Sequence, residues 1–353
     1  MRQVMKIVIA ATTAALTLTA CSSGGTTPAA TGGTSPAASS TAPALKIGMA
    51  YDVGGRGDQS FNDSAAAGLD KAKTEFGVDA KESAATNGEA ESAREERLNQ
   101  LIDAGYDNIV AVGFAYATAV GKVAKENPNV KFAIVDDATN KLDNVMNLTF
   151  AENEGSFLVG AAAALTTKTK HVGFVGGVET DLIKKFEAGY EAGVAAVDPS
   201  IKIDVKYLTQ PPDFSGFSSV DKGKAAAEGM YQGGADVVYH AAGGSGGGVF
   251  TAAKAAGKWA IGVDSDQAKT AAPDVQSVIL TSMLKRVDVA VYTFIKAVHD
   301  GTFKGGTQVF DLKVDGVGYS TTGGHIDAIK DKLEAYKADI ISGKITVPTA
   351  PTK

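Results

Sequence analysis

The chain has 353 residues, a formal net charge of −6 and 44% hydrophobic residues, so it can bury more than one hydrophobic core. No cluster of Lys or Arg stands out, which argues against a nucleic-acid backbone as the partner. A single cysteine, Cys21, excludes structural disulfides, and the four scattered histidines form no HExxH motif. We therefore expect neither a metal site nor a cofactor.

Residues 1–20 are expected to be a lipoprotein signal peptide. Arg2 and Lys6 precede an apolar stretch that is too short to span a membrane. The stretch ends in Leu18-Thr19-Ala20-Cys21, which resembles the lipobox of bacterial lipoproteins, whose cysteine becomes the acylated N-terminus. We expect lipid attachment at Cys21, a flexible tether over 21–44 rich in Ser, Gly, Thr, Pro and Ala, and a location on the extracytoplasmic face of the cell membrane.

The rest of the chain alternates short β-rich runs with Ala-rich helical patterns. Strands are predicted at 46–51, 108–112, 131–135, 145–150, 171–175, 203–208, 236–240, 259–263, 278–281 and 308–312. Helices are predicted at 61–76, 89–104, 117–126, 154–165, 180–197, 220–232, 249–256, 285–300 and 326–342. This alternation, with strands so apolar, predicts an α/β fold whose parallel sheets are covered on both faces by helices.

Ligands of open parallel sheets bind beyond the carboxyl ends of the strands. The residues that follow the predicted strands are mostly carboxylates and glycines: Asp52, Gly113, Phe114, Asp136, Asp137, Gly176, Gly177, 241–248, Asp264 and Asp266. Several strand ends with this composition indicate a ligand site along that edge, although a single Asp there is more often a turn or cap residue.

The glycine run at 243–248 contains a GxSxG motif with Ser245 in the position of a hydrolase nucleophile. Asp264 or Asp266, followed by His299 or His325, would complete the order Ser, Asp, His. The match carries little information because five of the six residues are glycine. The run more simply allows backbone N–H groups to approach a ligand, or forms a tight turn between strand and helix.

Five segments together resemble the basic membrane protein family of ABC-transporter substrate-binding lipoproteins, whose studied members include purine-nucleoside receptors. They are GDQSFND at 57–63, VDD at 135–137, FEAGYEAG at 186–193, HAAGGSGGGVF at 240–250 and IGVDSDQ at 261–267. The resemblance implies a type I periplasmic-binding-protein fold, in which two Rossmann-like lobes close on the ligand about a three-stranded hinge. The crossings are expected near Ala151, Thr281 and Gly305, which assigns 45–150 and 282–305 to lobe 1, and 151–281 and 306–353 to lobe 2.

The resemblance also implies roles for individual residues. Phe61 and Phe186 would form opposite walls of a slot that stacks a flat purine, although Phe61 could instead be a staple or core residue of its helix. Asp52, Asn62 and Asp136 would lie near the base, Asp264 and Lys285 would bind ribose hydroxyls, and Gly243 and Gly244 would offer backbone N–H groups. Taken by itself, Lys285 reads equally well as a solvated lysine at a helix start.

The expected function is that of a monomeric receptor that binds a purine nucleoside, such as inosine, guanosine or adenosine, without chemistry. Its partners would be the permease and ATPase subunits of an ABC importer. Two alternatives remain open: a binding protein for another small ligand, such as a sugar, a quorum-type signal or a pyrimidine nucleoside, and a surface serine hydrolase that uses Ser245.

Overall fold

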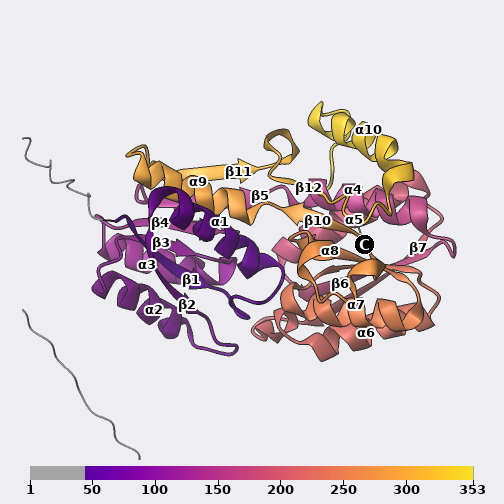
Figure 1. Ribbon diagram of the computed structural model, residues 1–353, viewed down its shortest axis with the longest axis horizontal. Helices are drawn as coiled ribbons and strands as arrows, with labels where there is room; N and C mark the ends of the chain where they lie inside the picture. Colours follow the sequence, from indigo (N-terminus) through magenta and orange to yellow (C-terminus); the bar gives the residue numbers. More distant parts are fainter. Residues whose placement is uncertain (1–43, 353) are drawn as a thin grey trace, which may run out of the picture. The chain divides into compact units, whose positions relative to one another are not determined.

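The computed structural model describes residues 44–352, so the predictions for the signal peptide, for Cys21 and for nearly all of the tether fall outside it. The described chain forms two six-stranded sheets, each with helices on both faces (Figure 1). The predicted α/β fold of two mostly parallel sheets is therefore confirmed. No helix within 44–352 combines the length and the apolarity that a membrane crossing requires.

The first sheet and its helices form lobe 1. Its strand order is β11-β5-β4-β3-β1-β2, and every neighbouring pair is parallel. The strands are β1 (Lys46–Tyr51), β2 (Asp79–Ala84), β3 (Asn108–Ala111), β4 (Lys131–Val135), β5 (Val145–Phe150) and β11 (Gly306–Phe310). One face is covered by α1 (Phe61–Phe76) and α9 (Val287–His299), the other by α2 (Glu91–Asp103) and α3 (Ala117–Glu126).

The second sheet and its helices form lobe 2, with strand order β12-β10-β9-β8-β6-β7. The strands are β6 (His171–Val178), β7 (Lys202–Thr209), β8 (Val237–Ala241), β9 (Trp259–Asp264), β10 (Ile279–Lys285) and β12 (Val317–Tyr319). The helices are α4 (Glu152–Thr166), α5 (Asp181–Val197), α6 (Val220–Gln232), α7 (Gly246–Ala256), α8 (Gln267–Thr270) and α10 (Lys330–Ile341). Helices α4 and α5 pack on one face of this sheet, and α6 and α7 on the other.

Helices α4 and α5 approach each other closely through glycines. A Cβ atom on Gly193 would lie 2.0 Å from the carbonyl oxygen of Phe157, and one on Gly189 would lie 2.1 Å from that of Asn153. Only glycine fits such backbone contacts, which hold α5, the carrier of Phe186, tightly against the start of α4.

Strands β2 and β12 were not predicted. The β2 sequence DAKESA has no apolar run, since it lies at the sheet edge and is only partly buried; its pairing with β1 defines it as a strand. Strand β12 has three residues and pairs antiparallel with β10. Both strands depend on a partner from elsewhere in the chain rather than on their own sequence pattern.

The chain passes between the sheets three times. The first passage lies at Ala151, between β5 and α4. The second follows Lys285 and the third follows Phe310, so both come later than the expected positions near 281 and 305. The reason is strand pairing: β10 continues beside β9 up to Leu284↔Asp264, and all of β11 pairs with β5 in lobe 1.

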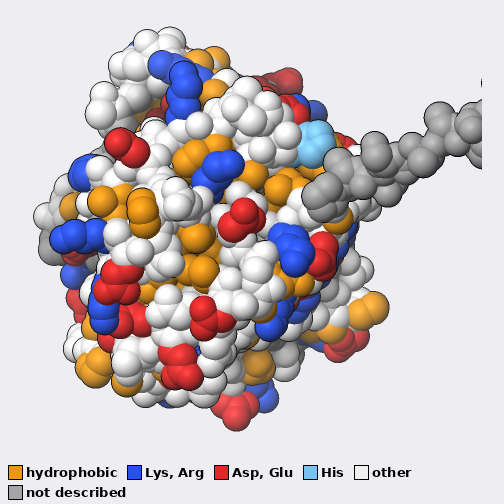
Figure 2. Space-filling view, turned by 90° about the vertical axis from the view of Figure 1, so that its left-hand side faces the viewer, with side chains coloured by type: hydrophobic (Ala, Val, Ile, Leu, Met, Phe, Trp, Pro, Cys, Tyr) orange, Lys and Arg blue, Asp and Glu red, His pale blue; other side chains and the backbone are white. Residues whose placement is uncertain are grey.

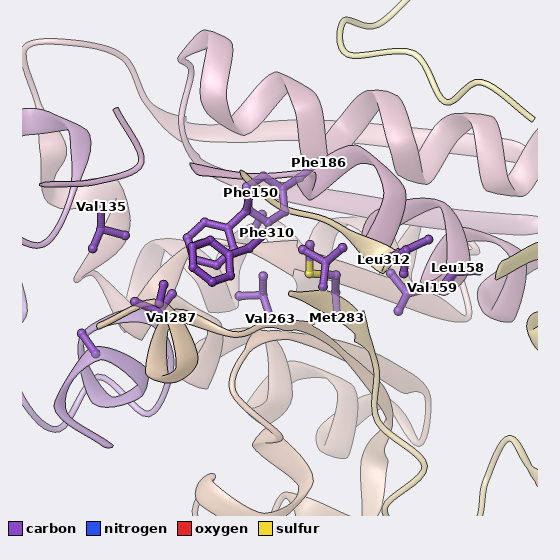
Figure 3. Packing of buried hydrophobic residues seen from close by; sticks show 14 of the residues in the cluster. Val135, Phe150, Leu158, Val159, Phe186, Val263, Met283, Val287, Phe310 and Leu312 are labelled. Atoms are coloured by element: carbon purple, nitrogen blue, oxygen red, sulfur yellow. The ribbon is translucent and has the colours of Figure 1, made fainter. Parts of the chain in front are cut away.

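Hydrophobic packing is continuous across the passages. The rings of Phe150 and Phe310, which end β5 and β11, stack with centroids 5.3 Å apart. Figure 3 shows these two rings near Phe186 of lobe 2, with Met283 and Leu312 close by. On the outside, Figure 2 shows acidic and basic side chains interspersed over one face rather than gathered by sign.

Candidate functional site

A cavity lies at the carboxyl ends of strands from both sheets. Its lining comes from both lobes: Asp52, Val53, Asp58, Phe61, Asn62, Gly113, Phe114, Asp136, Leu182, Ile183, Phe186, Phe217, Ala241, Gly243, Val263, Asp264 and Lys285. Every predicted site residue except Gly244 is in this set. Gly244 instead faces the segment of Asp58, whose Cβ would lie 3.7 Å from a Cβ at Gly244.

Asp58 caps helix α1 and thereby places Phe61. Its carboxylate accepts hydrogen bonds from the backbone N–H groups of Ser60 at 2.9 Å, Asn62 at 2.8 Å and Asp63 at 3.0 Å. These are donors at the start of the helix that have no partner within it. Phe61 is the first residue of α1, and it both lines the cavity and packs on the core, so the wall and core readings are compatible.

The amide of Asn62 is used inside lobe 1. Its Oδ1 accepts from the backbone N–H of Asp52 at 3.0 Å, and its Nδ2 donates to Asp58 at 3.1 Å. Asn62 is only 2% exposed. Asn62 lies in the cavity wall, and its side chain links the backbone of Asp52 to the carboxylate of Asp58.

Asp52 directly follows β1, is half-buried, and packs against Gly113, which follows the neighbouring strand β3. A Cβ at Gly113, which has φ +105°, would lie 2.6 Å from the Oδ2 atom of Asp52, so glycine is required there. Burial raises the pKa of Asp52 to about 6, although a hydrogen bond from the Val53 N–H opposes the shift. The side chain is therefore an ionised hydrogen-bond acceptor above about pH 6 and is mostly protonated below that pH.

Lys285 is the last residue of β10, not a helix-start lysine, because α9 begins at Val287. Its side chain is 2% exposed, and its Nζ lies 2.6 Å from Asp136 Oδ2 of lobe 1 and 3.5 Å from Glu152 Oε1. Burial disfavours the ammonium, but the charges of Asp136, Glu152 and Asp264 outweigh burial, and the pKa of Lys285 lies above its usual value. Lys285 is thus a charged donor shared by both lobes.

Three rings surround this ammonium. Its Nζ lies 5.0 Å from the ring centroids of Phe61 and Phe150 and 5.5 Å from that of Phe186, within cation–π range. The two predicted walls, one from each lobe, therefore face the same point in the cavity. Phe150 is not part of the cavity lining and belongs to the hydrophobic cluster seen in Figure 3.

Asp136 and Asp264, which come at the ends of β4 and β9, have left-handed backbones with φ of +68° and +63°. Such φ values are uncommon for residues other than glycine and concentrate at functional sites. Burial raises the pKa of Asp264 to about 7, although Lys285 and the hydroxyl of Ser60 lower it. One carboxylate oxygen of Asp136, Oδ1, is buried without a hydrogen-bond partner.

Sequence reasoning gave no role to two aromatic residues that line the cavity, Phe114 and Phe217. Phe114 comes immediately after the Gly113 that follows β3, so the strand-end rule had already marked it as a neighbour of the site. Phe217 lies in a short 3-10 turn, Phe214–Phe217, that follows no strand end directly and gave no signal. The ring centroids of Phe114 and Phe214 are 6.0 Å apart.

The geometry does not support a hydrolase site at Ser245. The side chain is fully buried outside the cavity lining, where its hydroxyl donates to the Gly216 carbonyl at 2.7 Å and accepts from the Ser219 N–H at 2.8 Å. His299 and His325 each contact another aromatic ring instead. The hydroxyl is thus engaged with backbone groups both as a donor and as an acceptor.

The comparisons with known proteins agree with this architecture. A family model described as ABC transporter substrate-binding protein PnrA-like matches residues 45–350. A Listeria monocytogenes protein named CD4+ T-cell-stimulating antigen is 42% identical over 328 residues, covering 86% of this chain and 88% of that protein. A Lactococcus lactis protein named ABC transporter nucleoside-binding protein BmpA is 38% identical over 321 residues, covering 86% and 89%.

A solved structure is similar over nearly the same range. The crystal structure of an ABC transporter solute-binding protein from Aeropyrum pernix K1 superposes with a TM-score of 0.75 at 32% identity. The match covers 88% of this chain and 94% of that chain, so it includes both lobes.

Proposed function

The chain belongs to the PnrA-like, or basic membrane protein, family of ABC transporter substrate-binding proteins, and from this premise we propose that it captures a purine nucleoside between its lobes. The observation that carries the proposal is the pairing of Phe61 from lobe 1 with Phe186 from lobe 2 around one cavity. A flat base stacked between these rings would contact both lobes, and neither lobe alone would complete its site. The name of the Lactococcus relative supports the same ligand class.

The polar lining suits a ligand rich in hydrogen-bond donors. Asp52, Asp136 and Asp264 are acceptors when ionised, and Asp136 Oδ1 has no partner in the protein. Ring N–H groups, exocyclic amines and ribose hydroxyls are donors of the required kind. Lys285 would supply the complementary donor to a hydroxyl or ring acceptor.

The charge of the lining favours a nucleoside over a nucleotide. Among the described residues that line the cavity, four are Asp and Lys285 is the only Lys or Arg. A phosphate group would meet several carboxylates and one ammonium that is already paired, which is unfavourable in a buried site. The lining therefore favours a neutral ligand.

The wider role follows from the family. We propose that the protein is monomeric, is held by a lipid on Cys21 at the extracytoplasmic face of the cell membrane, and presents its ligand to a permease driven by an ATPase. The apolar stretch and lipobox before Cys21, together with the tether that follows, support this location.

The test is a calorimetric panel with purified residues 45–353. We expect inosine, guanosine or adenosine to bind at least about 100-fold more tightly than uridine, ribose, hypoxanthine or inosine monophosphate, since about 2.7 kcal/mol separates them at that ratio. Tightest binding of ribose or uridine would replace the purine assignment with the sugar or pyrimidine alternative. Release of free base from inosine by the protein would instead indicate a hydrolase.

A further inference from the structure

Glu152 is a buried carboxylate outside the cavity lining. It is the first residue of α4, directly after the first passage between lobes, and it is 1% exposed. Burial raises its pKa, opposed by the charges of Lys285 and Lys185. A buried carboxylate is costly unless it is paired, so its partners indicate what it does.

Glu152 lies behind the ammonium that faces the cavity. Its Oε1 is 3.5 Å from Lys285 Nζ, and its Oε2 is 3.6 Å from Lys185 Nζ. The N-terminus of α4 further favours a negative charge at this position. The close glycine packing of α4 against α5 leaves the start of α4 little room to move.

A second counter-charge changes what Lys285 can offer. An ammonium has three N–H donors, and the short contact to Asp136 Oδ2 at 2.6 Å uses one of them. Without Glu152, Asp136 would be the only carboxylate of residues 44–352 left within ion-pair distance of the ammonium, and it would draw the ammonium away from the ligand. With Glu152 behind it, the ammonium is held from two sides, and Asp136 Oδ1 stays without a protein partner.

We propose that Glu152 is a positioning residue for ligand binding, which holds the Lys285 ammonium with one N–H directed into the cavity and leaves an oxygen of Asp136 for the ligand. This inference rests on the proposed nucleoside binding. It assigns a positioning role to a side chain outside the cavity lining.

The test compares Glu152→Gln with Glu154→Gln. Both remove a negative charge from the first turn of α4, but Glu154 accepts from the backbone N–H of Leu312 at 3.1 Å rather than pairing with Lys285. Inosine affinity measured by calorimetry should fall at least about tenfold in Glu152→Gln and stay within about twofold in Glu154→Gln. Equal losses in both variants would overturn the proposal in favour of a general helix-end effect.

A double-mutant cycle separates positioning from a structural role. In a Lys285→Met background, Glu152→Gln should change inosine affinity less than about threefold, because the group it positions is gone. A full tenfold loss in that background would overturn the proposal. Thermal unfolding of every variant shows whether it folds.

Glu152→Asp gives a second route to the same answer. The shorter side chain keeps the negative charge but moves it away from Lys285. The inosine affinity of Glu152→Asp should therefore lie between those of the wild type and Glu152→Gln. If Glu152→Gln fails to fold, the affinity of Glu152→Asp should be at least about threefold below that of the wild type. Affinity equal to that of the wild type would overturn the proposal. A wild-type protein that binds no nucleoside would overturn this inference and the proposed function together, whereas inosine binding unaffected by both Glu152 variants would overturn this inference alone.

Discussion

The hydroxyl of Ser60 in lobe 1 donates a 2.6 Å hydrogen bond to the Asp264 carboxylate in lobe 2. Further contacts join the same segments: Ser265 Oγ donates to the Ser60 carbonyl at 2.8 Å, and Gln267 Nε2 donates to the Gln59 carbonyl at 2.9 Å. The loop that leads into α1 is therefore held to the end of β9, with the cavity directly beside this contact.

We expect Ser60→Ala to weaken nucleoside binding by roughly tenfold, because a hydrogen bond to a charged group contributes about 1.5–3 kcal/mol and this one joins the two lobes beside the cavity. Ser64→Ala is the matched control, since the Ser64 hydroxyl accepts a hydrogen bond from the backbone N–H of Asp288 within lobe 1. Calorimetry measures the affinity, and small-angle scattering of the ligand-free variants should show expansion only for Ser60→Ala. Equal nucleoside affinities in the two variants would show that the hydrogen bond from Ser60 to Asp264 does not contribute to binding.

Both aromatic walls should be needed for binding. Phe61→Ala and Phe186→Ala each remove one stacking face, worth on the order of 1–3 kcal/mol, so inosine should bind at least about tenfold more weakly to either variant. Phe76→Ala serves as the control, because Phe76 ends the same helix as Phe61 but stacks on His299 outside the cavity. Unchanged inosine affinity in Phe61→Ala would reduce that residue to a core and staple role.

Asp264 should distinguish sugar recognition from base recognition. If it binds ribose hydroxyls, Asp264→Ala loses charge-assisted hydrogen bonds to the nucleoside that the free base never makes. The variant should therefore weaken inosine roughly tenfold more than hypoxanthine by calorimetry. The ratio is informative because loss of the Ser60 bond affects both ligands alike. A loss of the same factor for both ligands would make Asp264 a closure residue rather than a ribose clamp.

Nucleoside affinity should decline as the pH is lowered. The pKa of Asp264 is raised to about 7 and that of Asp52 to about 6, and a ligand that donates hydrogen bonds requires them ionised. We expect roughly tenfold weaker inosine binding at pH 6 than at pH 8, with proton release detectable as a buffer-dependent enthalpy. Asp264→Asn should remove most of the change between pH 8 and 6, and a flat profile in the wild type would contradict the mechanism.

The same two carboxyls affect the stability of the ligand-free protein in the opposite direction. Their pKa values are higher in the folded chain than in the unfolded chain, so the folded state binds more protons between about pH 4 and 7. Their contribution to the free energy of unfolding is present at low pH and is lost as the pH rises through 6 and 7. Thermal unfolding of Asp264→Asn against the wild type measures it.

Lipid attachment should decide where the protein resides. Cys21→Ser removes the acceptor of the acyl chain, and the chain described here has no helix suited to a membrane crossing within 44–352. We expect the wild type to remain with washed membranes and the variant to be released by a high-salt wash. A variant that stays with the membranes would contradict anchoring through Cys21.

Much of this protein is determined locally. Periodic apolar residues predicted helix 61–76, and an apolar run predicted strand 46–51, both at their observed bounds. The rule that ligands bind at strand ends located Asp52, Asp136 and Asp264. These successes share a physical cause: a central parallel strand must be apolar throughout, so the point where polar residues begin marks the sheet edge.

Other features depend on residues distant in sequence. Strand β2 forms because it pairs with β1, and Lys285 is a strand residue because it pairs with Val317 of β12. The pairing of Lys285 with Asp136, 149 positions away, and the placement of Glu152 behind it result from the passages between the lobes. No local sequence pattern predicts such contacts. A buried charged side chain needs an opposite charge beside it, and only the tertiary fold brings the two residues together.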